Sequence, residues 1–156
     1  MLVRYAGEAD AEQAASVLRP SIATLCSLDH GGAEDAIARW IGNKTADNVR
    51  RWIASPDGCV VVAEEHGVIV GVDAASFAGE ITLNCVAPEA RFAGVSKAIL
   101  AFLEARLREQ GQTRCMVTST RTARAFYLAC GYSDFSGPDV DGGQRLIKLL
   151  HTASAG

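Results

Sequence analysis

Residues 80–97 read EITLNCVAPEARFAGVSK, and this stretch decides the fold. Its first half, Glu80–Ala87, is predicted to be a strand; a turn containing Gly94 follows, and a helix begins at Val95. Such a junction attracts anions, because unpaired backbone N–H groups and the positive end of the helix dipole meet there. We therefore predict that Arg91–Lys97 binds a phosphate group.

The residue types in this turn suit a pyrophosphate. Gly94 allows the backbone to approach a ligand closely, Arg91 and Lys97 add positive charge, and Ser96 adds a hydroxyl donor. A purely structural interpretation stays open, because short patterns of this kind arise by chance and a glycine turn with a satisfied helix cap gives the same sequence.

The predicted strand has one face of chemical interest. Strict alternation places Ile81, Leu83 and Cys85 on one side and Glu80, Thr82, Asn84 and Val86 on the other. The second, more polar set is predicted to face a bound ligand.

The rest of the chain predicts a single mixed α/β domain over residues 1–150, with a flexible tail at 151–156. Further strands are expected at 2–6, 59–63, 68–75, 114–118 and 144–150. Helices are expected from Asp10, with a capping box formed with Gln13 and a kink or break at Pro20, then around Val49–Ile53, from Val95 to a stop at Gly111, and over 120–130.

Composition limits the class of protein. The chain has 156 residues, 49% of them hydrophobic and 21% charged, and a net charge of -3, which argues against disorder and nucleic-acid binding. No apolar run approaches the roughly 20 residues that span a bilayer, and the start at Met1 lacks the pattern of a signal peptide. We expect a cytoplasmic protein that does not bind membranes.

No metal site is predicted. The five cysteines are widely separated without a CxxC pair, and the three histidines are scattered. Buried, reduced thiols are the expected state of the cysteines, since no local pattern supplies the electropositive setting of a nucleophilic thiol.

Two segments together resemble the GNAT (GCN5-related N-acetyltransferase) family. In that family the turn reads Q/R-x-x-G-x-G/A, matched by Arg91–Ser96, and a later segment reads N-x-x-A-x-x-x-Y-x-x-x-G-F/Y, matched by residues 120–132 with Tyr127 at the tyrosine position. Ser96 replaces the usual Gly or Ala, and Thr120 replaces the frequent Asn. The resemblance covers about Cys59 to Tyr132 and implies a central, mostly antiparallel sheet, splayed in the middle, with helices on both faces.

The resemblance also implies acetyl-CoA, or another acyl-CoA, as co-substrate. Its pyrophosphate is expected on the turn made of Arg91, Phe92, Ala93, Gly94, Val95, Ser96 and Lys97. Its pantetheine arm is expected to pair with the main chain of Cys85, Val86 and Ala87 like an added strand, with Thr120 nearby. Arg121 and Arg124 are candidates for its remaining phosphate, although exposed arginines on a helix are more often only solvated.

Acyl transfer to an amine needs a proton donor for the thiolate that leaves. Tyr127 occupies the family's tyrosine position and is the predicted general acid; a core aromatic is the alternative. Glu80 is the predicted general base, because the histone acetyltransferase branch of the family has a glutamate there; an exposed strand-end carboxylate is the alternative. Asp73 is the reserve candidate, and a water chain can also accept the proton.

The predicted activity is that of an N-acetyltransferase acting on a primary amine of a small molecule or peptide. In the family, the segments that correspond to residues 26–44 and 135–143 set substrate selectivity. Both contain acidic residues in this chain, which favour a cationic amine. Two alternatives stay open: a catalytically silent CoA-binding regulatory module of the same fold, and an unrelated α/β domain that binds another phosphate ligand. A homodimer is expected only because it is the commonest assembly.

Overall fold

The computed structural model describes residues 1–25, 44–87, 90, 94–119, 123–135 and 144–150. The strands are β1 (Leu2–Tyr5), β2 (Gly58–Glu65), β3 (Val68–Ser76), β4 (Glu80–Val86), β5 (Arg114–Ser119), β6 (Ser133–Asp134) and β7 (Gln144–Leu149). The helices are the short 3-10 helix η1 (Glu8–Asp10), α1 (Ala11–Leu25), α3 (Ala46–Ala54), α4 (Val95–Glu109) and α5 (Arg124–Ala129).

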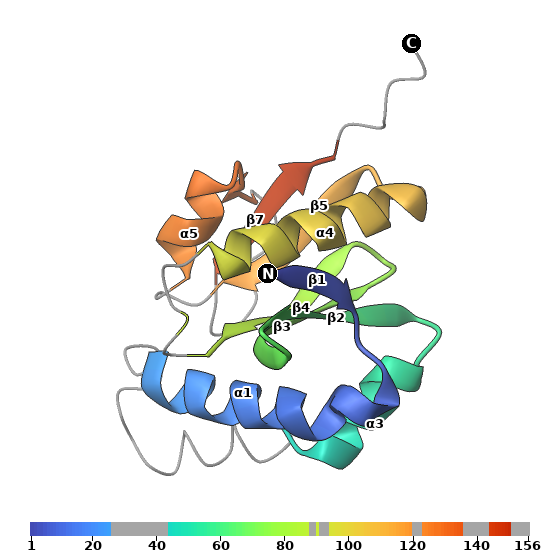
Figure 1. Ribbon diagram of the computed structural model, residues 1–156. Helices are drawn as coiled ribbons and strands as arrows, with labels where there is room; N and C mark the ends of the chain where they lie inside the picture. The colour runs from blue at the N-terminus through green and yellow to red at the C-terminus, as the bar shows by residue number, and fades with distance from the viewer. Residues whose placement is uncertain (26–43, 88–89, 91–93, 120–122, 136–143, 151–156) are drawn as a thin grey trace.

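All described strands belong to one sheet, in the order β1-β2-β3-β4-β5-β7-β6. Neighbouring strands are antiparallel except β4 and β5, which are parallel. Helices α1 and α3 cover one face, and α4 and α5 cover the other (Figure 1). This confirms the predicted mixed fold with a mostly antiparallel sheet between helices.

Helix α4 packs closely on the centre of the sheet. Its predicted apolar stripe is buried, with Ile99, Leu103 and Leu107 each 0% exposed. Gly71 of β3 permits the close approach, because a Cβ atom there would lie 2.5 Å from Cδ1 of Ile99 and 2.8 Å from Cγ1 of Val95. The first turn of α4 is therefore held directly on β3.

The amino-terminal helix differs from its prediction in two ways. Asp10 does not form a capping box with Gln13; it lies in η1, and its carboxylate accepts the N–H of Gly7 at 2.7 Å. Helix α1 also continues through Pro20, so the break, one of the two predicted effects of this proline, does not occur. A proline inside a helix costs about 3 kcal/mol, and burial of Ala14 and Leu18 at 0% exposure on the sheet side offsets that cost.

A β-bulge in β4 changes the predicted alternation of its side chains. Ala74 pairs with Leu83, but its neighbour Ala75 pairs with Ile81, so Thr82 is the extra residue. Paired residues point to the same face and successive residues to opposite faces, so Ile81 and Leu83 lie on opposite sides of the sheet. The prediction that they share a face is wrong.

Candidate active site

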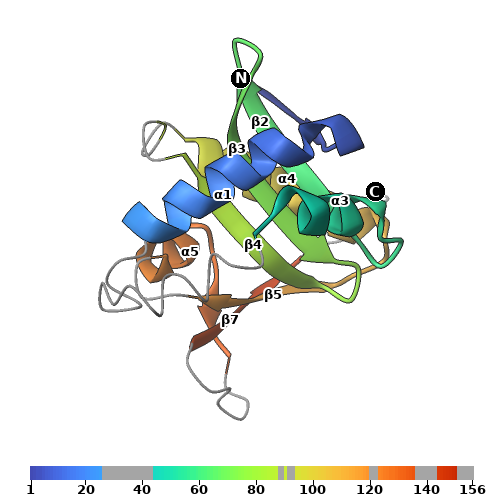
Figure 2. The ribbon, with the colours of Figure 1, turned by 90° about the horizontal axis from the view of Figure 1, so that it is seen from below.

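Strands β4 and β5 separate in the middle of the sheet. They pair only at Glu80 with Met116 and at Ile81 with Val117, although β4 continues to Val86 (Figure 2). No further pairing joins the two strands within the part of the chain that the structure describes. This gap between parallel strands is suited to an extended ligand that pairs with β4 as an added strand.

The main-chain direction along β4 selects which residues face the gap. The N–H of Ala87 donates to the carbonyl of Val70 on β3 at 2.8 Å. Because successive residues direct their main-chain groups to opposite edges of a strand, Cys85 also faces β3, whereas Asn84 and Val86 face the gap. Of the predicted stretch Cys85–Ala87, only Val86 directs its main-chain N–H and C=O toward the gap. Asn84, which was not in the predicted stretch, does so as well.

The start of α4 has the geometry of an anion site. Gly94 has φ 79°, a left-handed conformation that favours glycine, and beyond its chain neighbours no atom of the described residues lies within 4 Å of a Cβ placed on it. The first bond from the helix to this turn is the N–H of Ala98 to the carbonyl of Gly94, at 3.1 Å. The N–H groups of Val95, Ser96 and Lys97 therefore belong to the helix end, where no intrahelical partner exists.

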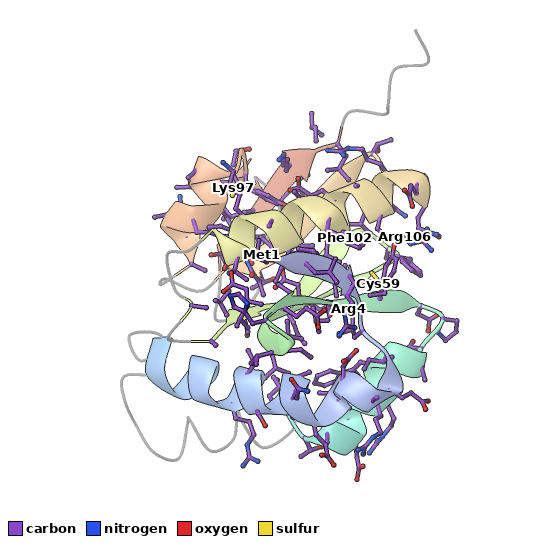
Figure 3. The ribbon with its side chains drawn as sticks, in the orientation of Figure 1. Met1, Arg4, Cys59, Lys97, Phe102 and Arg106 are labelled. Atoms are coloured by element: carbon purple, nitrogen blue, oxygen red, sulfur yellow. The ribbon has the colours of Figure 1, made fainter. Side chains whose placement is uncertain are left out.

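The other residues that were predicted to bind phosphate do not all lie within the described part of the chain. Lys97 is exposed and projects from the first turn of α4 (Figure 3). Arg91, Phe92, Ala93 and Thr120 lie outside the described residues, as does Arg121. Arg124 forms a bidentate ion pair with Asp134, at 2.8 and 3.0 Å, which commits its guanidinium to α5 and β6.

Tyr127 lies on α5 with its hydroxyl against β4. The side chain is only 3% exposed, and Nδ2 of Asn84 donates to its Oη at 3.0 Å. Burial raises the pKa of Tyr127 well above its usual value, so the hydroxyl keeps its proton at neutral pH. Among the described residues no acceptor takes that proton, which leaves it available to a ligand in the gap.

Glu80 lies on the other face of the sheet. It pairs with Ser76, whereas Asn84 pairs with Asp73, and Ser76 and Asp73 are an odd number of residues apart on β3. The prediction that Glu80 and Asn84 share a face is therefore wrong, because the bulge at Thr82 inverts the alternation between them.

A pocket of about 360 Å³ opens on this second face. It is lined by Lys44, Trp52, Ser55, Asp57, Gly58, Cys59, Val60, Ala74, Ala75, Ser76, Thr82 and Leu83. Lys44 is buried, with Nζ 5.9 Å from the centre of the Trp52 ring, and burial lowers its pKa. Sequence reasoning missed this pocket: Trp52 was expected on a helix, but nothing in the sequence marks Lys44 as its neighbour.

Other polar groups in the described residues support the fold. Glu104, 4% exposed, accepts from Tyr132 at 2.7 Å and from Lys148 at 3.0 Å. Burial raises the pKa of the Cys115 thiol to about 11, which opposes a nucleophilic role.

No group of three side chains in the described ranges is arranged to hold a metal ion. No helix described here combines the length and apolar character of a membrane span.

Solved structures share the arrangement of these elements. A GCN5-related N-acetyltransferase from Rhodopseudomonas palustris matches with a TM-score of 0.82 at 20% identity, covering 96% of this chain and 95% of that one. PaiA N-acetyltransferase from Thermoplasma acidophilum, in complex with coenzyme A, matches with a TM-score of 0.80 at 17% identity, covering 95% and 98%. Ribosomal-protein-alanine N-acetyltransferase from Brucella melitensis matches with a TM-score of 0.62 at 22% identity, covering 96% and 100%.

These likenesses establish the fold, and the family follows from the sequence itself. No curated protein matches the chain. The family model described as the acetyltransferase (GNAT) domain matches residues 29–149, which is most of the sequence. The chain therefore belongs to the GNAT family of acetyltransferases.

Proposed function

We propose that this protein transfers an acyl group, most simply acetyl, from acyl-CoA to a primary amine of a small molecule or peptide. The observation that carries the proposal is a juxtaposition: the gap between β4 and β5, the helix end at Gly94 and the buried hydroxyl of Tyr127 border the same part of the sheet.

The residues present fit coenzyme A. The left-handed turn at Gly94, clear of side chains among the described residues, and the N–H groups of Val95–Lys97 suit its pyrophosphate. The edge of β4 at Asn84 and Val86 suits its pantetheine arm. When bound, acyl-CoA supplies an acyl group on a thioester whose thiol, with a pKa near 8.5, is a good leaving group.

Tyr127 is the proposed proton donor to that thiol. Asn84 holds the phenol oxygen through its amide N–H, so the hydroxyl proton points elsewhere. A phenol with a raised pKa is a weak acid, but it needs only to give a hydrogen bond or a late proton to a group that already tolerates negative charge.

The acceptor amine is proposed to enter from the opposite face, through the pocket beside Trp52. A group held between β4 and β5 would have Asn84 and Tyr127 on one face of the sheet and the pocket residue Leu83 on the other. Register places Glu80 on the face of the pocket, next to the pocket residue Ser76. This supports Glu80, rather than Asp73 on the far face, as the base.

The first test is calorimetric titration with acetyl-CoA of the wild type and of two matched variants, Gly94→Glu and Gly111→Glu. Both glycines have positive φ, 79° and 86°, and lie at the two ends of α4; within the described part of the chain, a Cβ on either one meets nothing within 4 Å. Each variant therefore carries similar backbone strain and the same added charge.

We expect micromolar binding by the wild type and Gly111→Glu, and loss of binding in Gly94→Glu. An amine screen that detects thiol release then tests turnover. Equal binding by both variants would remove the helix end from the cofactor site. Binding without turnover of any amine would favour the silent regulatory module, and no binding by folded wild type would refute the proposal.

A further inference from the structure

Asp73 is buried in the centre of the sheet without a hydrogen-bond partner. It is 0% exposed, and neither carboxyl oxygen meets a donor with hydrogen-bond geometry among the described residues. Burying a charged carboxylate in this way is costly, and a group of this kind requires an explanation.

The side chain directly opposite Asp73 has the same deficiency, an acceptor oxygen without a donor. Asp73 pairs with Asn84 across β3 and β4, and Oδ1 of Asn84 is also buried without a donor. The bond from Ala87 to Val70 sets the ladder so that Asp73 and Asn84 form a non-hydrogen-bonded pair. In such pairs the Cα atoms lie only about 4.5 Å apart, so two short side chains reach each other.

For the amide orientation in which Nδ2 of Asn84 donates to Tyr127, counting protons identifies the missing donor. Nδ2 of Asn84 already donates to Tyr127, and Oδ1 needs a hydrogen. An ionised Asp73 offers only acceptors to Oδ1, whereas a neutral carboxylic acid offers one O–H. Burial raises the pKa of Asp73 well above its usual value and so favours the neutral acid. The nearby backbone N–H of Cys85, which does not reach hydrogen-bond geometry with the carboxyl, opposes this shift only in part.

We propose that Asp73 is a positioning residue for the acyl transfer proposed above: as a neutral acid it donates to Oδ1 of Asn84 and fixes the amide orientation in which Nδ2 donates to Tyr127. In the reversed orientation, Oδ1 of Asn84 would accept the hydroxyl proton of Tyr127 and withdraw it from the ligand. The neutral acid thereby keeps the proton of Tyr127 directed at the gap. This inference rests on the proposed function for its catalytic consequence, and on the geometry of the two side chains for the hydrogen bond itself.

The kinetic test compares Asp73→Asn with Asp73→Leu and Asp73→Ala, using an amine that the wild type acetylates. Asn offers an N–H donor of the same size, so this variant is expected to restore kcat to within about twofold. Leu and Ala offer none, and kcat is expected to fall about five- to tenfold, equivalent to about 1–1.4 kcal/mol at 1.36 kcal/mol per factor of ten. KM for acetyl-CoA should stay within about twofold in all three, because Asp73 is 0% exposed and the inference gives it no contact with the cofactor.

A spectroscopic measurement tests the hydrogen bond without turnover. The side-chain ¹³C carboxyl resonance of Asp73, identified by its loss in Asp73→Asn, differs between the acid and its anion. We expect the acid at pH 7 in the wild type. The anion at pH 7, or equal kcat in Asp73→Leu and Asp73→Asn, would overturn the inference. A wild type that acetylates no amine would refute the proposed function, while the resonance would still decide the state of Asp73.

Discussion

Gly71→Ala tests whether the packing of α4 on β3 builds the cofactor site. The added Cβ would lie 2.5 Å from Ile99 and 2.8 Å from Val95, whereas ordinary contact begins at 3.4 Å. The first turn of α4 must therefore move away from the sheet by about 1 Å, or Ile99 must leave its rotamer. Overpacking of this size costs about 1–3 kcal/mol, which for a chain of this length lowers Tm by roughly 3–10 °C.

The same displacement should weaken cofactor binding. The proposed hydrogen bonds from Val95–Lys97 to the phosphates of acyl-CoA would be charge-assisted and worth about 1.5–3 kcal/mol each. Affinity for acetyl-CoA should therefore fall at least about tenfold if one of them lengthens beyond its range. Thermal unfolding and calorimetric titration measure the two effects. Gly7→Ala is the matched control, because its Cβ meets only Oδ2 of Asp10 at 3.8 Å. A Gly71→Ala protein with the Tm and affinity of this control would refute the reasoning.

Three further perturbations separate chemistry from stability. Tyr127→Phe should lower kcat on the order of a hundredfold while the Kd of acetyl-CoA stays within about twofold; unchanged turnover would remove the tyrosine from the acid role. Lys148→Met leaves the buried carboxylate of Glu104 with one donor fewer and should cost about 2–4 kcal/mol in urea unfolding. Arg4 donates two hydrogen bonds to the carboxylate of Asp10, at 2.8 and 3.0 Å, and these hold the pKa of Asp10 below its usual value. The ionised Asp10 therefore stabilises the folded protein at pH values above the unfolded pKa, and this stabilisation is lost as pH falls through the folded pKa. Asp10→Asn should accordingly be less stable than the wild type at pH 7, and the difference should vanish in acid; a pH-independent difference would contradict this.

The helices and turns that are specified by residues close together in sequence could be predicted. Helix α4 is bracketed by Gly94 and Gly111, both with positive φ, and its buried stripe follows the helical period, so its start, end and buried face could be predicted together. The turn before it combines a special backbone conformation with a helix end, and both depend on residues adjacent in sequence. The position of Tyr127 came from the resemblance to a family, since nothing in its immediate neighbours distinguishes a site tyrosine from a core one.

The parts that depend on pairing between distant segments were not predictable. The β4 sequence alternates regularly, and the bulge at Thr82 exists only relative to Ala74 and Ala75 on β3. One strand read alone therefore assigns Glu80 and Asn84 to the same face. Strand β6 has two residues and is defined only by its pairing with β7.

The bulge gives the two faces of β4 their different roles. If the same residues alternated regularly without the bulge, Ile81 would still face α4, but Asn84 would turn toward α1 and α3, away from Tyr127. With it, Asn84 lies opposite Asp73 and bonds the tyrosine, while Leu83 points into the pocket on the other face. One extra residue at the place where β4 leaves β5 thus puts Tyr127, the proposed proton donor, and the pocket, the proposed entry of the amine, on opposite faces of the sheet. If the proposed roles hold, the leaving thiol and the attacking amine meet different side chains.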